Sequence, residues 1–363
     1  MRQRPIDPRL DSLLKAAQRA PAGRERVALL EQAADVADSV GDPDSGWQAR
    51  LSLFSTSEYA TPVPRLFPAL AWCLAMHDRE PQRFPAFSIL WYMKWIVSSA
   101  PLFASLPTAA IDGLLSDLES RFLRTGMSRR GFVQQRLGVD TTMGRLDRIR
   151  SGLEELQRQT RGMGDDCRAC EQDRKVEALL RLGEVELALF EARAIIAGRL
   201  SCMGVPASTF AALLIHLRSR GEIDLAVRLY REGHSKLRDE VGQLSSLSRY
   251  MIHAAITGDI DRATRWWKRW KQDAETHATD FARMEFHAAS AVLLTRLAFT
   301  GVDHVAAPST SSRLGLSVDN PLALAQRYTE SALDLSQRFD ERNGNTVVSA
   351  EMKGWLSHAR DKH

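Results

Sequence analysis

The clearest chemical pattern in the sequence is a group of three cysteines and one histidine. Cys167 and Cys170 have the C-x-x-C spacing, while Cys202 and His234 lie further along the chain. Thiolates at this spacing, joined by an imidazole, are typical ligands of tetrahedral zinc. These four residues are therefore the candidate ligands of a structural zinc ion. Weaker candidates for the fourth ligand are two acids and a mid-helix histidine: Asp165, Asp166 and His216.

These thiols can meet only if the intervening chain forms a helical hairpin. Apolar periodicity predicts one helix over about 170–181 and a second over about 184–198. In an antiparallel hairpin, the start of the first helix and the end of the second lie at the same end. Cys167 and Cys170 precede or open this hairpin and Cys202 follows it, so we expect their side chains to converge. The histidine of the group ends the next hairpin and is expected at that same end.

Two other interpretations of the cysteines stay open. They are small apolar side chains that pack well in a core without further chemistry. Alternatively, Cys167 and Cys170 form a redox pair, although a redox C-x-x-C usually opens a helix after a strand, and no strand pattern precedes it here. Cys73 lies beside Trp72 in an apolar segment and is expected in the core. Four cysteines without a recognisable export signal favour a reducing, cytoplasmic compartment.

Positive charge is concentrated in one stretch of the chain. Residues 121–161 contain ten arginines, no lysine and four acids, whereas the whole chain has a net charge of only +4. Clustered guanidinium groups can bind an acidic peptide, a phosphate-bearing ligand or RNA. The alternative is a solvated helix face. The arginines that we expect to contact a partner are Arg129, Arg130, Arg145 and Arg148.

Aromatic residues provide a second candidate contact surface. Trp91 and Trp95 are four residues apart, so they share one face of a helix. Aromatic side chains are common anchors at protein interfaces, and these two are expected to line a binding groove. Packing in the core is the alternative interpretation.

The segment Trp266–Lys271 alternates aromatic and basic residues, as in some nucleic-acid-binding surfaces. Its spacing favours a different arrangement. Trp267 and Trp270 share a helical face with Ala263 and should pack inward. A solvated basic face is then expected on the other side of the same helix.

Composition excludes several classes of protein. The chain has 363 residues, of which 44% are hydrophobic and 26% are charged, as in ordinary globular proteins. The apolar stretch 84–107 is nearly long enough to span a bilayer, but Lys94 lies at its centre and predicts a buried helix. We find no nucleotide-binding, zinc-protease or nucleophile-elbow motif, so no enzymatic activity is predicted.

Three short phrases recur along the chain. They begin at Gly183, Gly221 and Gly258, which are 38 and 37 residues apart. In each phrase the glycine is followed by an acid, an apolar residue and a second acid, and an alanine stands five residues after the glycine. A glycine ends a helix in the left-handed conformation, acids suit the first turn of the next helix, and a small alanine lets two helices approach. The phrases therefore predict stacked helical hairpins.

This pattern resembles the tetratricopeptide repeat, most clearly over about residues 165–275, although the period exceeds the usual 34. The resemblance implies an all-α fold: a right-handed superhelix of stacked hairpins with a concave surface. We expect divergent hairpins over 1–160, the clearest repeats over 161–300, a surface loop over 301–319 and a final hairpin over 320–363. No strand pattern competes with this prediction.

The resemblance also implies function. Bacterial proteins of this type are scaffolds, so we expect a cytoplasmic adaptor that binds a protein or peptide in its concave groove. One alternative is a regulatory sensor of a peptide or small ligand. A second alternative is an RNA- or DNA-associated protein that uses the arginine-rich stretch, whose affinity would fall steeply with salt.

Overall fold

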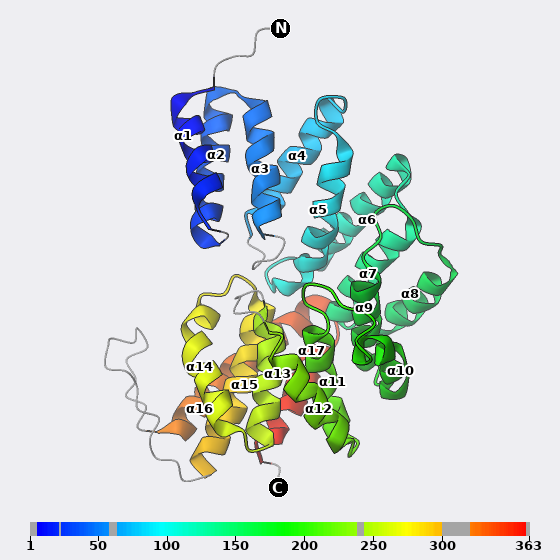
Figure 1. The fold of residues 1–363 in the computed structure, drawn as a ribbon, viewed down its shortest axis with the longest axis vertical. Helices are drawn as coiled ribbons and strands as arrows, with labels where there is room; N and C mark the ends of the chain where they lie inside the picture. Colours follow the sequence, from blue (N-terminus) through cyan, green and yellow to red (C-terminus); the bar gives the residue numbers. More distant parts are fainter. Residues whose placement is uncertain (1–5, 22, 58–63, 238–242, 300–319, 361–363) are drawn as a thin grey trace.

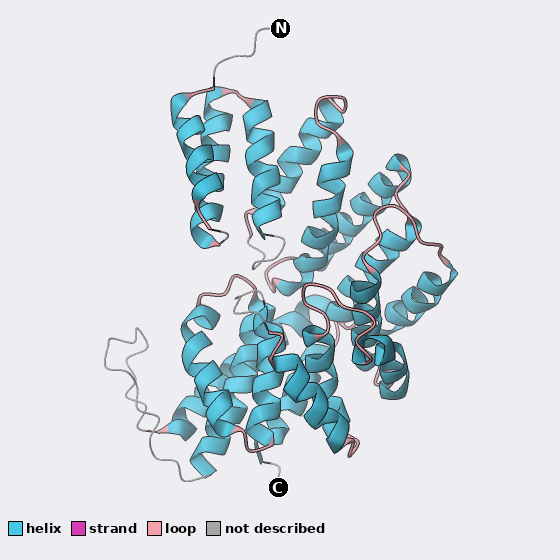
Figure 2. Cartoon of the chain, viewed as in Figure 1, coloured by secondary structure: helices cyan, strands magenta, loops and turns pink. Residues whose placement is uncertain are grey.

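The structure is a computed structural model that describes residues 6–21, 23–57, 64–237, 243–299 and 320–360 (Figure 1). These residues form seventeen α-helices and two short 3-10 helices, and they contain no strand (Figure 2). The prediction of an all-α superhelix of stacked helices is confirmed. The loop expected over 301–319 lies outside the described residues.

The element bounds are α1 (Pro8–Arg19), α2 (Arg24–Val40), α3 (Pro43–Ser57), α4 (Leu66–Arg79), α5 (Ala86–Ser99), η1 (Ala100–Leu102), α6 (Thr108–Thr125), α7 (Arg129–Met143), α8 (Leu146–Arg158), α9 (Arg168–Arg181), α10 (Val185–Ile196), α11 (Ala207–Ser219), α12 (Ile223–His234), α13 (Leu244–Ile256), α14 (Ile260–Glu275), α15 (Asp280–Phe299), α16 (Pro321–Asn343), α17 (Val347–Ser357) and η3 (His358–Arg360). Figure 1 shows α1 to α5 at the N-terminal end of the molecule and α11 to α16 at the opposite end.

The recurring glycine phrases form the turns of three helical hairpins. Gly183, Gly221 and Gly258 all have a positive φ, between 77° and 88°. The acid after the glycine also closes the preceding helix, because the Glu184 amide donates to the Leu179 carbonyl at 2.9 Å. This is the bond of a Schellman motif, which satisfies a carbonyl that the helix end leaves free. The hairpins are therefore α9–α10, α11–α12 and α13–α14, as predicted.

Neighbouring hairpins stack through their first helices. The helices α5, α7, α9, α11, α13 and α15 form a continuous row in which each packs against the next. Each second helix packs beside its own first helix, and the alanines of the three phrases lie in these contacts: Ala188, Ala226 and Ala263 are at most 1% exposed. A larger side chain there would push the two helices apart.

Two large hydrophobic cores meet at α9. Ala178 belongs to the core formed mainly by α2 to α8, whereas Val176 and Leu179 belong to the core formed by α9 to α17. One helix thus contributes to both cores from different faces. The division into ranges 1–160 and 161–300 stays a prediction, but the continuous row of helices across this point joins the two halves.

The apolar helix α5 is buried along one face. Lys94, at its centre, donates to Asp166 Oδ1 and to the Gly164 carbonyl oxygen, both at 2.8 Å. Such an ion pair explains how a charge is accommodated in an apolar helix. Among the described residues, no helix has both the length and the apolar character needed to cross a bilayer.

The last two helices turn back toward the middle of the chain. Asn345, in the turn between α16 and α17, donates from Nδ2 to the Met143 carbonyl at 2.9 Å. Val347 packs against Gly144, where an added Cβ would lie only 2.7 Å from the valine Cβ. Since Gly144 also has a φ of 67°, both its conformation and its neighbour require glycine. This contact seats α17 beside the row of first helices.

Candidate functional site

The structure brings three of the four expected metal ligands together. Cys167 is the N-cap of α9, and its Sγ accepts a hydrogen bond from the Cys170 amide at 3.4 Å. Cys202 lies in the loop after α10, where its amide donates to the Val205 carbonyl at 3.0 Å. The three Sγ atoms lie within 4.8 Å of one another. The three thiols thus lie at the same end of the array, as a single hairpin predicts.

His234 does not belong to this cluster. Its Nε2 lies 3.3 Å from Nη1 of Arg262, and its ring packs against Tyr230 and Trp266. The expectation that His234 supplies a fourth ligand is therefore not met. Each hairpin of a superhelix is rotated relative to the last, so the end of one hairpin does not lie directly over the end of the next.

The weaker candidates for a fourth ligand are also engaged elsewhere. Asp166 pairs with Lys94, and Asp165 accepts hydrogen bonds from the Ser128 hydroxyl and the Gly162 amide. Among the described residues, no fourth histidine, cysteine or acid joins the three thiols. A metal ion bound there would therefore have three protein ligands.

The three thiols are not equivalent. Burial would raise the pKa of Cys167, but hydrogen bonds from the Cys170 amide and the neighbouring thiols outweigh it and lower that pKa. Burial and the adjacent thiols raise the pKa of Cys170. Cys167 also lies at the N-terminus of α9, where the helix dipole favours an anion. Cys167 is therefore the first of the pair to become a thiolate, which is the form that binds metal.

The arginines expected to contact a partner are paired within the protein. Arg130 forms a buried, two-pronged ion pair with Glu171, at 2.8 and 2.5 Å. Arg129 pairs with Glu155 at 2.8 Å and also with Glu119. These contacts join α7 to α6, α8 and α9, so the two side chains hold helices together.

The other two arginines lie beyond the far end of α7, at the start of α8. Arg145 pairs with Asp112 at 2.7 Å and with Asp140 at 3.1 Å, and the more exposed Arg148 lies about 3.5 Å from the same two acids. Since α7 has 15 residues, about 22 Å separates its two ends. The four arginines therefore do not form one continuous contact surface.

The two tryptophans of α5 occupy different surroundings. Trp91 is 38% exposed, and Nζ of Lys94 lies 4.0 Å from the centre of its ring. Trp95 is half-buried and packs against the N-terminal core. On α14, Trp267 and Trp270 are buried, as their spacing predicts. Neither Trp91 nor Trp95 lies in the cavity described next.

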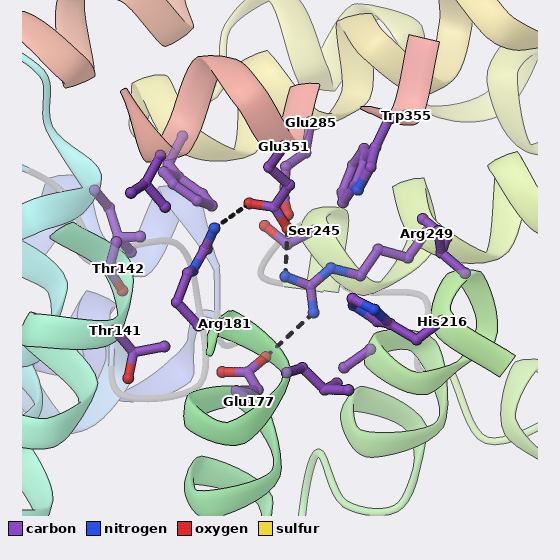
Figure 3. Close-up of a pocket in the computed structure, with 16 residues that line it drawn as sticks. Thr141, Thr142, Glu177, Arg181, His216, Ser245, Arg249, Glu285, Glu351 and Trp355 are labelled. Carbon is purple, nitrogen blue, oxygen red and sulfur yellow. Dashed lines mark hydrogen bonds and ion pairs between the residues drawn. The ribbon is translucent and has the colours of Figure 1, made fainter. Parts of the chain in front are cut away.

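A partly enclosed cavity of about 440 Å³ lies beside the row of first helices (Figure 3). One wall is formed by η1, α7, α9, α11, α13 and α15, and the other by α17. Sequence reasoning missed this site because its lining comes from seven separate elements. The lining residues are Leu102, Thr141, Thr142, Glu177, Leu180, Arg181, Ala212, Ile215, His216, Ser245, Arg249, Phe281, Glu285, Val347, Glu351 and Trp355.

Charged side chains cross this cavity in pairs. Arg249 donates to Glu177 Oε1 at 3.2 Å and to Glu285 Oε1 at 3.1 Å, while Arg181 pairs with Glu351 of α17 (Figure 3). These ion pairs connect α9, α13, α15 and α17. Ion pairs with little exposure to solvent are weakly screened, so they fix the positions of these side chains.

Burial affects the titration of several of these groups. It is the main factor that lowers the pKa of His216, and the nearby Arg249 and Arg181 lower it further. His216 is therefore uncharged at neutral pH. Burial raises the pKa of Glu285, with Arg249 and Ser245 opposing this effect only in part. The cavity thus contains one carboxyl group whose charge is not fully compensated.

The chain was compared with known proteins. No protein-family model matches it, and no significant match to a curated protein was found. Its function is therefore inferred from the cavity and from the thiol cluster.

Proposed function

We propose that the protein is a helical-repeat regulator that binds a small ligand in the cavity between the row of first helices and α17. The observation that carries this proposal is a cavity of about 440 Å³ with both apolar and charged walls. Binding sites for small molecules are typically 300–1,000 Å³ and combine an apolar lining with a few fixed polar groups. No step of catalysis is part of this proposal.

An open groove for a protein partner has less support. α17 lies along the same side of the row that would form such a groove. Its Glu351 pairs with Arg181, and its Trp355 lies 5.9 Å from the Arg249 guanidinium. A partner helix or peptide would have to displace these contacts, whereas a small molecule would not. The nucleic-acid alternative is also weakened, because four arginines of the stretch that it would use are paired internally.

The central hairpins fit this role as divergent tetratricopeptide-like repeats. Their turns begin with Gly183, Gly221 and Gly258 and repeat nearly the same geometry. In such arrays each hairpin contacts only its neighbours, so a ligand that bridges several hairpins changes the curvature of the whole. The cavity is lined by α9, α11 and α13 together, which provides this bridge. Four free cysteines are consistent with a reducing, cytoplasmic setting.

We also propose that the thiol cluster holds a structural zinc ion. Cys167, Cys170 and Cys202 supply soft ligands that zinc prefers, within 4.8 Å of one another. The ion would tie the start of α9 to the loop after α10. The fourth coordination position is left for water or for a ligand from outside the described residues.

Thermal unfolding in the presence of a small-molecule library tests the ligand proposal. A ligand at 100 times its Kd stabilises a folded protein by about 2.7 kcal/mol, or about 3.5 °C in Tm for a chain of this length. The variant Ala212→Phe places a ring in the cavity, and Ala350→Phe places the same ring on an exposed position of α17. A true cavity ligand raises the Tm of the wild type and of Ala350→Phe only. Compounds that act equally on Ala212→Phe would contradict the proposal.

A further inference from the structure

Glu285 carries a buried carboxylate oxygen that receives no hydrogen bond from the described residues. It belongs to α15 and is only 1% exposed. Its Oε1 accepts a hydrogen bond from Arg249, and the nearby Ser245 helps to lower its pKa, but no donor lies within hydrogen-bond distance of the buried Oε2. Buried carboxylate oxygens in folded proteins are normally hydrogen-bonded, so an oxygen left without a donor marks a place for a ligand. Figure 3 shows this residue beside Glu351, at the edge of the cavity near α17.

The charges around the cavity favour a cation. Three carboxylates and two guanidinium groups line it: Glu177, Glu285, Glu351, Arg181 and Arg249. The histidine of the lining is uncharged at neutral pH, because burial and the two arginines lower its pKa. With all three carboxyl groups ionised, the lining carries one net negative charge. A ligand with one positive charge would neutralise it, whereas an anion would add to it.

Other acids near the cavity do not change this sign. Asp173 lies one helical turn before Glu177 on α9 and accepts hydrogen bonds from Ser208, at 3.0 Å, and from Thr209. It does not line the cavity. Any charge on Asp173 adds to the negative field around Glu177.

The remaining walls favour an apolar body on the ligand. Trp355 and Phe281 face the cavity together with the aliphatic side chains Leu180, Ile215 and Val347. Aromatic faces also attract cations through their ring quadrupoles. A hydrocarbon stem would contact these residues while a charged nitrogen donates to the free oxygen of Glu285.

We infer that the cavity takes a small organic monocation, an ammonium or amidinium group on an apolar stem, with an N–H donating to Glu285 Oε2. This inference rests on the proposed function, because it names the class of ligand for that cavity. It assigns Glu285 as the residue that selects for charge. The two arginines hold the neighbouring carboxylates in place and leave this one oxygen for the ligand.

Calorimetric titration with matched probes tests the ligand class. The probes are the butyl, cyclohexylmethyl and benzyl ammonium ions, each compared with the alcohol and the carboxylate of the same stem. At least one ammonium ion should bind the wild type ten times more tightly than its alcohol. Glu285→Gln should lose this preference, because its amide can still accept from Arg249 but carries no charge. As a control, Glu186→Gln neutralises an ion-paired acid at an exposed position of α10, outside the cavity, and should retain the preference.

The possible results separate the two proposals. If every ammonium ion binds no better than its alcohol, or if Glu285→Gln keeps the preference, the ligand class is wrong. If Glu285→Gln fails to fold by circular dichroism, the comparison of probes on the wild type decides alone. If a neutral or anionic library compound stabilises the wild type but not Ala212→Phe, the cavity function stands and the cation does not. If no compound of any charge stabilises the protein, both fail.

Discussion

Replacing Arg130 by alanine should destabilise the protein strongly, although a cluster of arginines in the sequence suggests a binding surface. The guanidinium forms two hydrogen bonds with Glu171, at 2.8 and 2.5 Å. It also donates to the carbonyls of Leu156 and Gln159, at 2.6 and 2.5 Å, which lie at the end of α8. One side chain thus joins α7, α8 and α9.

The magnitude follows from what the substitution leaves behind. Breaking a buried ion pair by removing one partner costs about 3–5 kcal/mol, because the remaining charge stays buried. Glu171 is only 6% exposed, but Arg161 still pairs with it at 2.7 Å. This second partner places the expected loss at the lower end, about 3 kcal/mol. For a chain of this length, that corresponds to a fall in Tm of about 4 °C.

Urea unfolding followed by circular dichroism measures this loss, with Arg148→Ala as the matched control. Arg148 is 54% exposed and lies 3.5 and 3.6 Å from two acids that it shares with Arg145. Exposed pairs contribute at most about 1 kcal/mol. The reasoning is refuted if Arg130→Ala loses less than about 1 kcal/mol, or if both variants lose the same amount.

Three further predictions concern the metal, the pH dependence of stability and the packing of α17. Purified protein should contain about one zinc ion per chain by elemental analysis, and zinc addition should raise the Tm of the wild type. The variant Cys202→Ser should lose both the zinc ion and this rise in Tm. Burial and the neighbouring Glu177 raise the pKa of Asp173 to about 7. An acid whose folded-state pKa is raised keeps its proton in the folded state, so wild-type stability should fall from about pH 4 to pH 7 relative to Asp173→Asn; parallel stability curves would contradict this. Gly144→Ala should lower the Tm by several degrees, because the methyl group would meet Val347 and φ is positive; an unchanged Tm would mean that α17 does not pack there.

The sequence predicted those parts of the fold that depend on local signals. A glycine such as Gly183 readily adopts the positive φ that ends a helix, and the acid after it caps the adjacent helices. A hairpin can therefore be inferred from a few residues. The convergence of Cys167 and Cys202 followed from one hairpin. His234 required the rotation between two hairpins as well, and nothing in a single sequence specifies that rotation.

The cavity could not be predicted, because its residues have no shared local pattern. Glu177 and Arg181 look like an ordinary exposed pair on α9, and Glu351 lies 170 residues beyond Arg181. The one available signal was Glu285, an acid between Met284 and Phe286 in α15. The arginines show the opposite limit: composition reports their number, while their partners within the protein, such as Glu171, are set by the tertiary fold. That they contact another molecule stays a prediction.

The position of α17 links ligand binding to the packing of α17 against the row of first helices. The cavity exists only while Glu351 and Trp355 of α17 face the row of first helices, because these two residues form its second wall. A ligand that contacts both residues therefore binds only while α17 is packed against the row, and its binding free energy stabilises that packing. By the same linkage, any change that loosens the packing of α17 lowers the affinity for the ligand, even where it leaves Glu285 and the other wall untouched. Gly144, which does not line the cavity, is thus expected to influence affinity through the packing of α17.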